Sequence, residues 1–184
     1  MYKYEKKLAF PVNVTKKDLR MAKYIISALG GAAGELGAAL RYFSQSFSMP
    51  DDRGKALLTD IATEELGHCE MVSTMFRQLI KDASLDELEK AGLGEYYTEH
   101  GKGVYPIDPL GFQFTASYFA STGNPVADLA EDMAAEEKAR AGYENLINLT
   151  NDEELIGPLL FLRQREVIHY NRFKELYEEY KKSQ

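Results

Sequence analysis

The sequence predicts an all-α protein folded as a four-helix bundle, and three observations carry this prediction. Four long segments repeat apolar residues at spacings of three and four, the period of an amphipathic helix. Only Thr150 and Asn151 separate the last two segments, which makes them antiparallel neighbours. A long stretch without helical period divides the four segments into two pairs. The chain of 184 residues, 1–184, is expected to form a single domain.

The first helix is expected over 16–47 and the second over 51–82. Thr15 suits the N-cap of the first helix, which ends before a Ser-Met-Pro sequence. Asp51 suits the start of the second, because negative charge is favourable at a helix N-terminus. A short amphipathic segment, 84–92, follows the second helix.

The third helix is expected over 125–149 and the fourth over 152–182, each with acidic residues near its first turn. Residues 93–122 mix glycine, proline and aromatic residues, so we expect an irregular crossover connection there. Residues 1–15 are expected to form an N-terminal arm. Two helical hairpins joined by one long connection have the connectivity of ferritin-like bundles.

Charge and composition argue against several classes of function. A net charge of -7 argues against nucleic acid or an anionic membrane as a partner, since both bind clustered Lys and Arg. The apolar stretch 25–40 is short for a membrane span and contains Glu35, so membrane insertion is not expected. The single cysteine, Cys69, excludes an intrachain disulfide, and the N-terminus lacks the apolar run of a signal peptide. We therefore expect cytoplasmic synthesis without secretion.

Two of the expected helices carry a Glu-x-x-His pair on a face that is otherwise apolar. Glu65 and His68 form this pair in the second helix, and Glu166 and His169 repeat it in the fourth. Residues three apart project from the same face of a helix, so both side chains of a pair point into the bundle. One such pair arises easily by chance, whereas two in alternate helices make a specific signal.

Each of the other two helices supplies one inner acid. Glu35 lies among glycines and alanines in the first helix, and Glu136 lies in the third. Glu137 projects about 100° away from Glu136 and is expected to face solvent. One Glu from each of two helices, with a Glu-x-x-His from each of the others, is the ligand set of dimetal carboxylate bundles. On this interpretation Glu166 is a ligand like the other glutamates.

Taken singly, such a glutamate is more often a solvated helix residue, and such a histidine a hydrogen-bonded core residue. Together they favour a dimetal site, because four buried carboxylates would repel one another unless cations held them ionised. Carboxylate and imidazole ligands suit manganese or iron, and the lack of thiolate ligands argues against structural zinc. Cys69 is interpreted as a small core residue and His100 as a surface or loop histidine.

The stretch GGAAGELGAAL is expected to lie inside the first helix, although glycine disfavours helix interiors. Four small residues would let neighbouring backbones approach closely around Glu35. They are Gly30, Gly31, Gly34 and Ala38. Close helix packing alone also explains the glycines, but it does not explain the acid.

Four segments, one from each expected helix, resemble the manganese catalases: GAAGELGAALRYFSQ, ATEELGHCEM, DMAAEEKARAGYENL and LLFLRQREVIHYNRF. The lone acids and the Glu-x-x-His pairs occur in that family's order, and the length and opening of the chain resemble its short spore-coat branch. The resemblance implies two manganese ions per chain and the disproportionation of hydrogen peroxide to water and dioxygen. It also implies a homo-oligomer, a hexamer in the family, with other spore-coat proteins as partners.

The resemblance further implies a role for each site residue. It assigns five metal ligands: Glu35, Glu65, His68, Glu136 and His169. The first three would hold one manganese, with Glu65 bridging to the second, and the last two would bind that second ion. Glu166 would be an outer-sphere acid/base rather than a ligand, and Tyr42 a hydrogen-bond partner close to the metals.

Two features differ from longer members of the family. The chain stops soon after the fourth helix, without the C-terminal extension that embraces neighbouring subunits, and Ala135 occupies a position where some relatives carry a charged side chain. The aromatic segment Tyr96–Phe119 is a candidate either for subunit contacts or for covering the core. Two other functions stay open: a di-iron ferroxidase or peroxidase of the ferritin-like group, and a coat protein in which the site is mainly structural.

Overall fold

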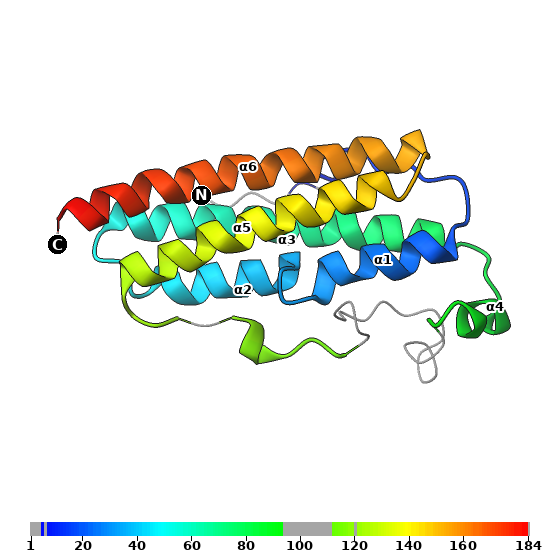
Figure 1. Ribbon diagram of the computed structural model, residues 1–184, viewed down its shortest axis with the longest axis horizontal. Helices are drawn as coiled ribbons and strands as arrows, with labels where there is room; N and C mark the ends of the chain where they lie inside the picture. Colours follow the sequence, from blue (N-terminus) through cyan, green and yellow to red (C-terminus); the bar gives the residue numbers. More distant parts are fainter. Residues whose placement is uncertain (1–4, 6, 94–111, 120, 184) are drawn as a thin grey trace.

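The computed structural model describes residues 5, 7–93, 112–119 and 121–183, and the elements in these ranges are helices (Figure 1). Four helices precede the long connection: α1 (Leu19–Gly30), α2 (Glu35–Ser46), α3 (Asp52–Leu79) and the short α4 (Leu85–Lys90). A single 3-10 turn, η2 (Ala116–Tyr118), and two long helices, α5 (Pro125–Asn148) and α6 (Glu153–Lys182), follow it. The predicted all-α bundle is confirmed.

The helices form two antiparallel hairpins that pack side by side. In Figure 1, α1 and α2 follow one another along α3, which runs back beside them, and α5 and α6 form the second hairpin above. Side-chain caps set the helix starts: Asp51 accepts from Gly54 N at 2.8 Å, and Asn124 and Asp152 cap α5 and α6. The described part of the connection between the hairpins, 112–119, lies beside α2 (Figure 1).

The expectation of one unbroken first helix over 16–47 is wrong. The chain leaves helical geometry at Gly31 and re-enters it at Glu35, the first residue of α2. Gly34 explains why, since a Cβ there would lie 2.9 Å from the Ala28 carbonyl oxygen. The turn folds back onto the end of α1 more closely than any side chain permits. The close backbone approach expected around Glu35 is therefore present at Gly34, but it occurs at a break between two helices and not inside one helix.

The start of the first helix also differs from the expectation. Asp18 is the N-cap of α1 and accepts from Met21 N at 2.9 Å, so Thr15 is not the cap. Thr15 donates its backbone N–H and hydroxyl to Glu154 at 2.8 and 2.7 Å. The residues before α1 are thereby tied to the start of α6, far away in the chain.

Two apolar clusters make up the core, and a polar layer lies between them. One cluster is built on α1, the C-terminal half of α3 and the N-terminal half of α6; the other is built on α2, the N-terminal half of α3 and the C-terminal half of α6. The Glu-x-x-His pairs of α3 and α6 fall at the junction. The bundle thus places its ionisable residues at mid-height, shielded at both ends.

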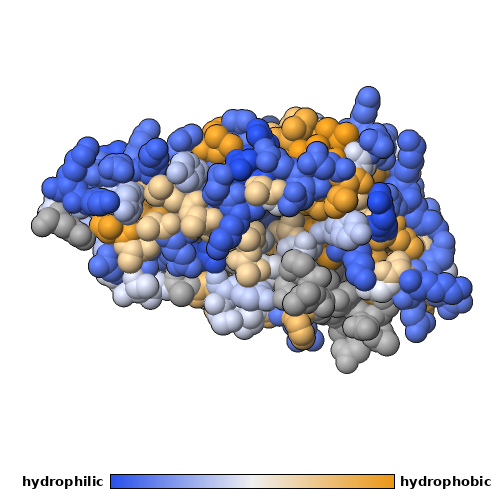
Figure 2. All heavy atoms as spheres, viewed as in Figure 1, coloured by the Kyte–Doolittle hydropathy of each residue, from blue (hydrophilic) through white to orange (hydrophobic). Residues whose placement is uncertain are grey.

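Several expectations fall on residues outside the described ranges. These are most of the connection 93–122, most of its segment Tyr96–Phe119, part of the arm 1–15, and His100. None of the described helices combines the length and apolar character needed to cross a bilayer. In the view of Figure 2, both ends of the molecule are mainly hydrophilic, and apolar side chains gather over its middle and upper right.

Candidate dimetal centre

Six ionisable side chains meet between the two apolar clusters, and none is more than 3% exposed. They come from four helices: Glu35 of α2, Glu65 and His68 of α3, Glu136 of α5, and Glu166 and His169 of α6. Glu35 is in the first turn of α2, where the helix dipole favours a carboxylate. Glu136 lies in the middle of α5. The structure thus brings together the six glutamate and histidine residues selected from the sequence.

The six side chains form two groups that could each hold a metal ion. One group is Glu35, Glu65, His68 and Glu166, and the other is Glu65, Glu136, Glu166 and His169. In each group, one potential ligand atom per residue lies within 4.8 Å of all the others. Glu65 and Glu166 belong to both groups. The geometry therefore provides two adjoining cation positions with two carboxylates placed between them.

The two imidazole rings face the shared carboxylate of Glu65 through equivalent atoms. His68 Nδ1 lies 2.7 Å from Glu65 Oε2, and His169 Nδ1 lies 2.8 Å from Glu65 Oε1. The rings are 5.6 Å apart and inclined by only 23°. Both histidines thus direct Nδ1 inward, and the Nε2 atoms point to the outside of the site.

Burial and mutual charge shift the pKa of several groups. Burial, followed by the charge of Glu65, raises the pKa of Glu35 to about 8. Burial and the charges of Glu35 and Glu65 raise the pKa of Glu166 well above its usual value. Burial acts against the charged form of His169, but Glu65 and Glu136 outweigh it and raise its pKa to about 11. Without a bound cation, protons on these groups compensate the clustered carboxylates.

The donor set fits divalent cations of the manganese or iron type. Within the described residues, Glu65 Oε1, Glu136 Oε2 and Glu166 Oε1 are buried and accept no hydrogen bond. Buried carboxylate oxygens are normally paired, so these atoms have capacity for a ligand. Cys69 belongs to neither group, and burial raises the pKa of its thiol, which agrees with its interpretation as a core residue.

Two buried tyrosines connect the two halves of the site, one half carried by α2 and α3 and the other by α5 and α6. The Tyr42 hydroxyl of α2 donates to Glu136 of α5, and the Tyr143 hydroxyl of α5 donates to Glu35 of α2. Each tyrosine thus holds the lone acid of the other half. Tyr42 was selected from the sequence, whereas Tyr143 was not.

A constant offset in the sequence could have identified Tyr143. Each site residue of the first half has a counterpart 101 positions later: 35 and 136, 42 and 143, 65 and 166, 68 and 169. Tyr143 therefore bears the same relation to Glu136 as Tyr42 bears to Glu35. The prediction that Glu137 faces solvent is confirmed, since its side chain is 54% exposed and pairs with Arg140 at 2.6 Å.

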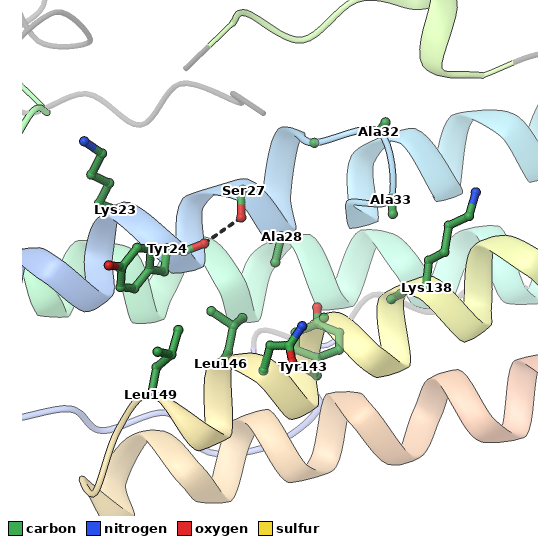
Figure 3. Close-up of a pocket in the computed structure, with 14 residues that line it drawn as sticks. Lys23, Tyr24, Ser27, Ala28, Ala32, Ala33, Lys138, Tyr143, Leu146 and Leu149 are labelled. Carbon is green, nitrogen blue, oxygen red and sulfur yellow. Dashed lines mark hydrogen bonds between the residues drawn. The ribbon is translucent and has the colours of Figure 1, made fainter. Parts of the chain in front are cut away.

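A surface groove leads toward the site between α1 and α5. Its volume is about 500 Å³, and Tyr143 lies among its lining residues (Figure 3). Lys23 and Lys138 stand at opposite ends with their ammonium groups directed away from the lining. A second, smaller chamber beside Glu35, Glu136 and Glu166 has room for about one water molecule.

Three alanines line both the groove and the chamber. They are Ala32 and Ala33 of the turn between α1 and α2, and Ala139 of α5. Ala135, one turn before Ala139, also lines the chamber. Small apolar side chains of the turn after α1 and of α5 therefore lie where the groove meets the chamber, next to Tyr143.

Comparison with known proteins agrees with this geometry. The family model described as "Manganese containing catalase" matches residues 1–184. Protein CotJC of Bacillus subtilis (strain 168) is 49% identical over 178 residues, covering 97% of this chain and 94% of the relative. The manganese catalase of Bacillus subtilis is 34% identical over 186 residues, covering 94% of this chain and 68% of the relative.

A solved structure shares the fold. Wild-type KatB, a manganese catalase from Anabaena, superposes with a TM-score of 0.85 at 34% identity, covering 97% of this chain and 80% of that chain. The match therefore extends over the bundle and the four helices that carry the site. With a family model spanning the whole sequence and relatives of this identity, the chain belongs to the manganese-containing catalase family.

Proposed function

We propose that this chain is a dimanganese catalase that converts two molecules of hydrogen peroxide to two of water and one of dioxygen. The observation that carries the proposal is the pair of buried four-residue groups that share Glu65 and Glu166. Membership of the manganese catalase family supports manganese as the metal. When bound, the two ions would supply the two-electron redox chemistry of the reaction.

The proposed ligands divide between the two cation positions. Glu35 and His68 would hold one ion and Glu136 and His169 the other, while Glu65 would span both because each of its oxygens lies near one histidine. The tyrosines would keep the two lone acids in place, each by donating to one carboxylate oxygen. The second oxygen of Glu136 then stays available for the metal.

Glu166 is proposed to be the acid/base of the reaction. It lines the chamber together with Glu35, Glu136 and Tyr42, so its carboxyl group can take a proton from a peroxide there or return one. Its presence in both ligand groups also fits the interpretation from spacing alone, in which Glu166 is a ligand. The two roles, acid/base and metal ligand, predict different effects on metal content when Glu166 is replaced by glutamine.

The chamber and the alanines at its edge support a small substrate. A chamber with room for about one water molecule favours a substrate of very few atoms, such as hydrogen peroxide, over larger molecules. The surface groove beyond the alanines would let such a substrate approach the chamber.

Metal analysis and oxygen evolution test the proposal directly. The protein is expressed with manganese and iron both supplied, its metal content is measured, and oxygen release from peroxide is followed at an electrode. We expect two manganese ions per chain and sustained oxygen release. Two irons with no oxygen release would instead favour the di-iron ferroxidase or peroxidase, and manganese-loaded protein without activity would overturn the catalase proposal.

The variant Glu166→Gln separates the roles of Glu166. As an acid/base, it should retain both manganese ions and lose activity by about 10²–10⁴-fold. As a required ligand, it should lose metal together with activity. Glu137→Gln on α5, whose side chain is exposed, is the control and should leave metal content and turnover unchanged.

We further propose that the protein forms homo-oligomers, up to the hexamer of the family, and associates with the spore coat. The support for the second statement is the resemblance to the short spore-coat branch together with the 49% identity to protein CotJC. Light scattering gives the oligomer size. Detection of the protein in extracted spore coats tests the association, and Glu166→Gln protein that assembles normally but lacks turnover would exclude a purely structural site.

A further inference from the structure

Glu64 of α3 holds a position between the outer nitrogens of both histidines. Its Oε2 lies 3.2 Å from His169 Nε2, and its Oε1 lies 3.7 Å from His68 Nε2. These are the nitrogens that point out of the site, opposite the Nδ1 atoms beside Glu65. A single carboxylate from outside the ligand set therefore faces both imidazole rings.

Arg165 of α6 holds Glu64 in this position. Its Nε lies 2.5 Å from Glu64 Oε1 and its Nη2 lies 3.1 Å from Oε2. The guanidinium therefore donates one hydrogen bond to each carboxylate oxygen. Such bidentate pairs restrict orientation more strongly than single contacts do. Each oxygen of Glu64 thus has one guanidinium nitrogen and one imidazole nitrogen as neighbours.

We propose that Glu64 is a positioning residue shared by both halves of the dimetal centre: its carboxylate faces Nε2 of both histidines, where it would accept from Nε2–H of each when the metals are bound, and so directs both Nδ1 atoms toward the metals. Histidine ligands in metal sites usually donate their second nitrogen to a carboxylate or carbonyl group, which fixes the tautomer and the ring orientation. Here one carboxylate serves two ligands, because the rings are nearly parallel and 5.6 Å apart. The inference rests on the proposed metal centre and extends it to a residue outside the ligand set.

A second ion pair between the same helices provides a matched control. Asp60 lies on α3, four residues before Glu64, and its carboxylate pairs with Arg172 of α6 at 2.6 Å. The Asp60 side chain is 66% exposed, whereas that of Glu64 is 26% exposed, and Asp60 makes no contact with either histidine among the described interactions. Removing either acid leaves one arginine of α6 without that partner, but only Glu64 acts on the imidazoles.

The test is manganese binding, which requires no peroxide turnover. Metal-free wild-type, Glu64→Ala, Glu64→Gln and Asp60→Ala proteins are titrated with Mn²⁺, and free Mn²⁺ is measured by electron paramagnetic resonance. We expect Glu64→Ala to weaken both binding events by about 10–100-fold and Asp60→Ala to leave both unchanged. Glu64→Gln has one acceptor oxygen for two rings, so it should weaken binding less than alanine does.

Each other outcome contradicts the proposal. Wild-type affinity in Glu64→Ala would show that the contacts do not matter, and an equal loss in Asp60→Ala would reduce Glu64 to an ordinary interhelical ion pair. Loss of a single binding event would show that Glu64 serves one histidine only. If Glu64→Ala fails to fold, Glu64→Gln, whose side chain has a similar shape, is compared with wild type and Asp60→Ala in the same Mn²⁺ titration. Weaker binding of both ions would then support the proposal, and unchanged binding would contradict it.

The outcomes also separate this inference from the proposed function. Wild-type protein that binds two Mn²⁺ ions without releasing oxygen would overturn the catalase proposal and leave the positioning role intact. Wild-type protein that binds no Mn²⁺ would overturn both.

Discussion

The two halves of the bundle supply the same site residues by different local structures. In the first half, Glu35 begins a new helix directly after a break, whereas its counterpart Glu136 lies within the uninterrupted α5. Both acids are buried and both receive a hydrogen bond from a tyrosine of the other half. The chemistry of the site is therefore repeated, but the path of the chain that presents it is not.

This difference concentrates the openings of the site on one side. The turn of small residues after α1 lines both the groove and the chamber. On α5, Ala139 also lines both, and Ala135, four residues earlier, lines the chamber. The halves differ again just before the Glu-x-x-His pairs, where Glu64 in α3 faces Arg165 in α6. Candidate ligands in near-symmetric positions are thus combined with surroundings that differ between the halves, and in the described part of the chain a groove meets the chamber beside the break in the first helix.

The largest effect is expected from Glu65→Gln, because Glu65 is the residue on which both halves converge. Replacing its charge with an amide should remove most of both manganese ions, whereas Glu35→Gln and Glu136→Gln should each reduce the content by about one ion. Elemental analysis of the purified proteins measures this. Equal losses in all three variants would show that the halves do not load separately.

The tyrosines test whether the halves are equivalent. Tyr42→Phe and Tyr143→Phe each remove the donor to one buried carboxylate, so each should destabilise the manganese-loaded protein by about 1.5–3 kcal/mol. Urea denaturation followed by circular dichroism gives both values. A large effect of Tyr42→Phe with none for Tyr143→Phe would break the equivalence that the 101-residue offset indicates.

The break in the first helix is tested at Gly34. Gly34→Ala places a Cβ 2.9 Å from the Ala28 carbonyl oxygen, so the turn must shift, at a cost of about 1–3 kcal/mol, and Glu35 moves with it. We expect lower stability and lower manganese content. The control, Gly67→Ala in α3, meets no atom within 4 Å and should raise stability by about 0.5–1 kcal/mol. Full manganese content in Gly34→Ala would contradict the role given to the break.

The smallest effect is expected at the entrance. Ala139→Leu narrows the point where groove and chamber meet, so kcat/KM for peroxide should fall by about tenfold while manganese content stays the same. Ala134→Leu adds the same bulk on an exposed face of α5 and should leave kcat/KM unchanged. An unaltered kcat/KM in Ala139→Leu would place the entrance elsewhere.

Much of the site could be predicted because its signals are local. A Glu and a His three residues apart project from one helical face whatever the rest of the chain does, and apolar neighbours tell which face is buried. This reasoning was sufficient to select Glu65, His68, Glu166 and His169, and the helix periods were sufficient for the bundle. The structure brings these residues together, and their roles as ligands stay a proposal.

Other features could not be read from local spacing. The glycines before Glu35 were expected to bring backbones close together inside one helix, but Gly34 makes its close approach to the backbone of Ala28 and Leu29, across a break between α1 and α2. Glu64 projects about 100° from Glu65, away from the face that carries the Glu-x-x-His pair, and it was not selected from the sequence. Its contact with His169 depends on how α6 is rotated against α3.

The sequence by itself determined the residue types, their helical faces and the order in which the candidate ligands occur along the chain. Only the tertiary structure decided where the first helix breaks, that Tyr143 reaches Glu35, and that Glu64 lies beside both histidines. The physical reason is that spacing within a helix sets the direction of a side chain relative to that helix alone. The rotation and height of one helix against another arise from packing between segments far apart in the chain.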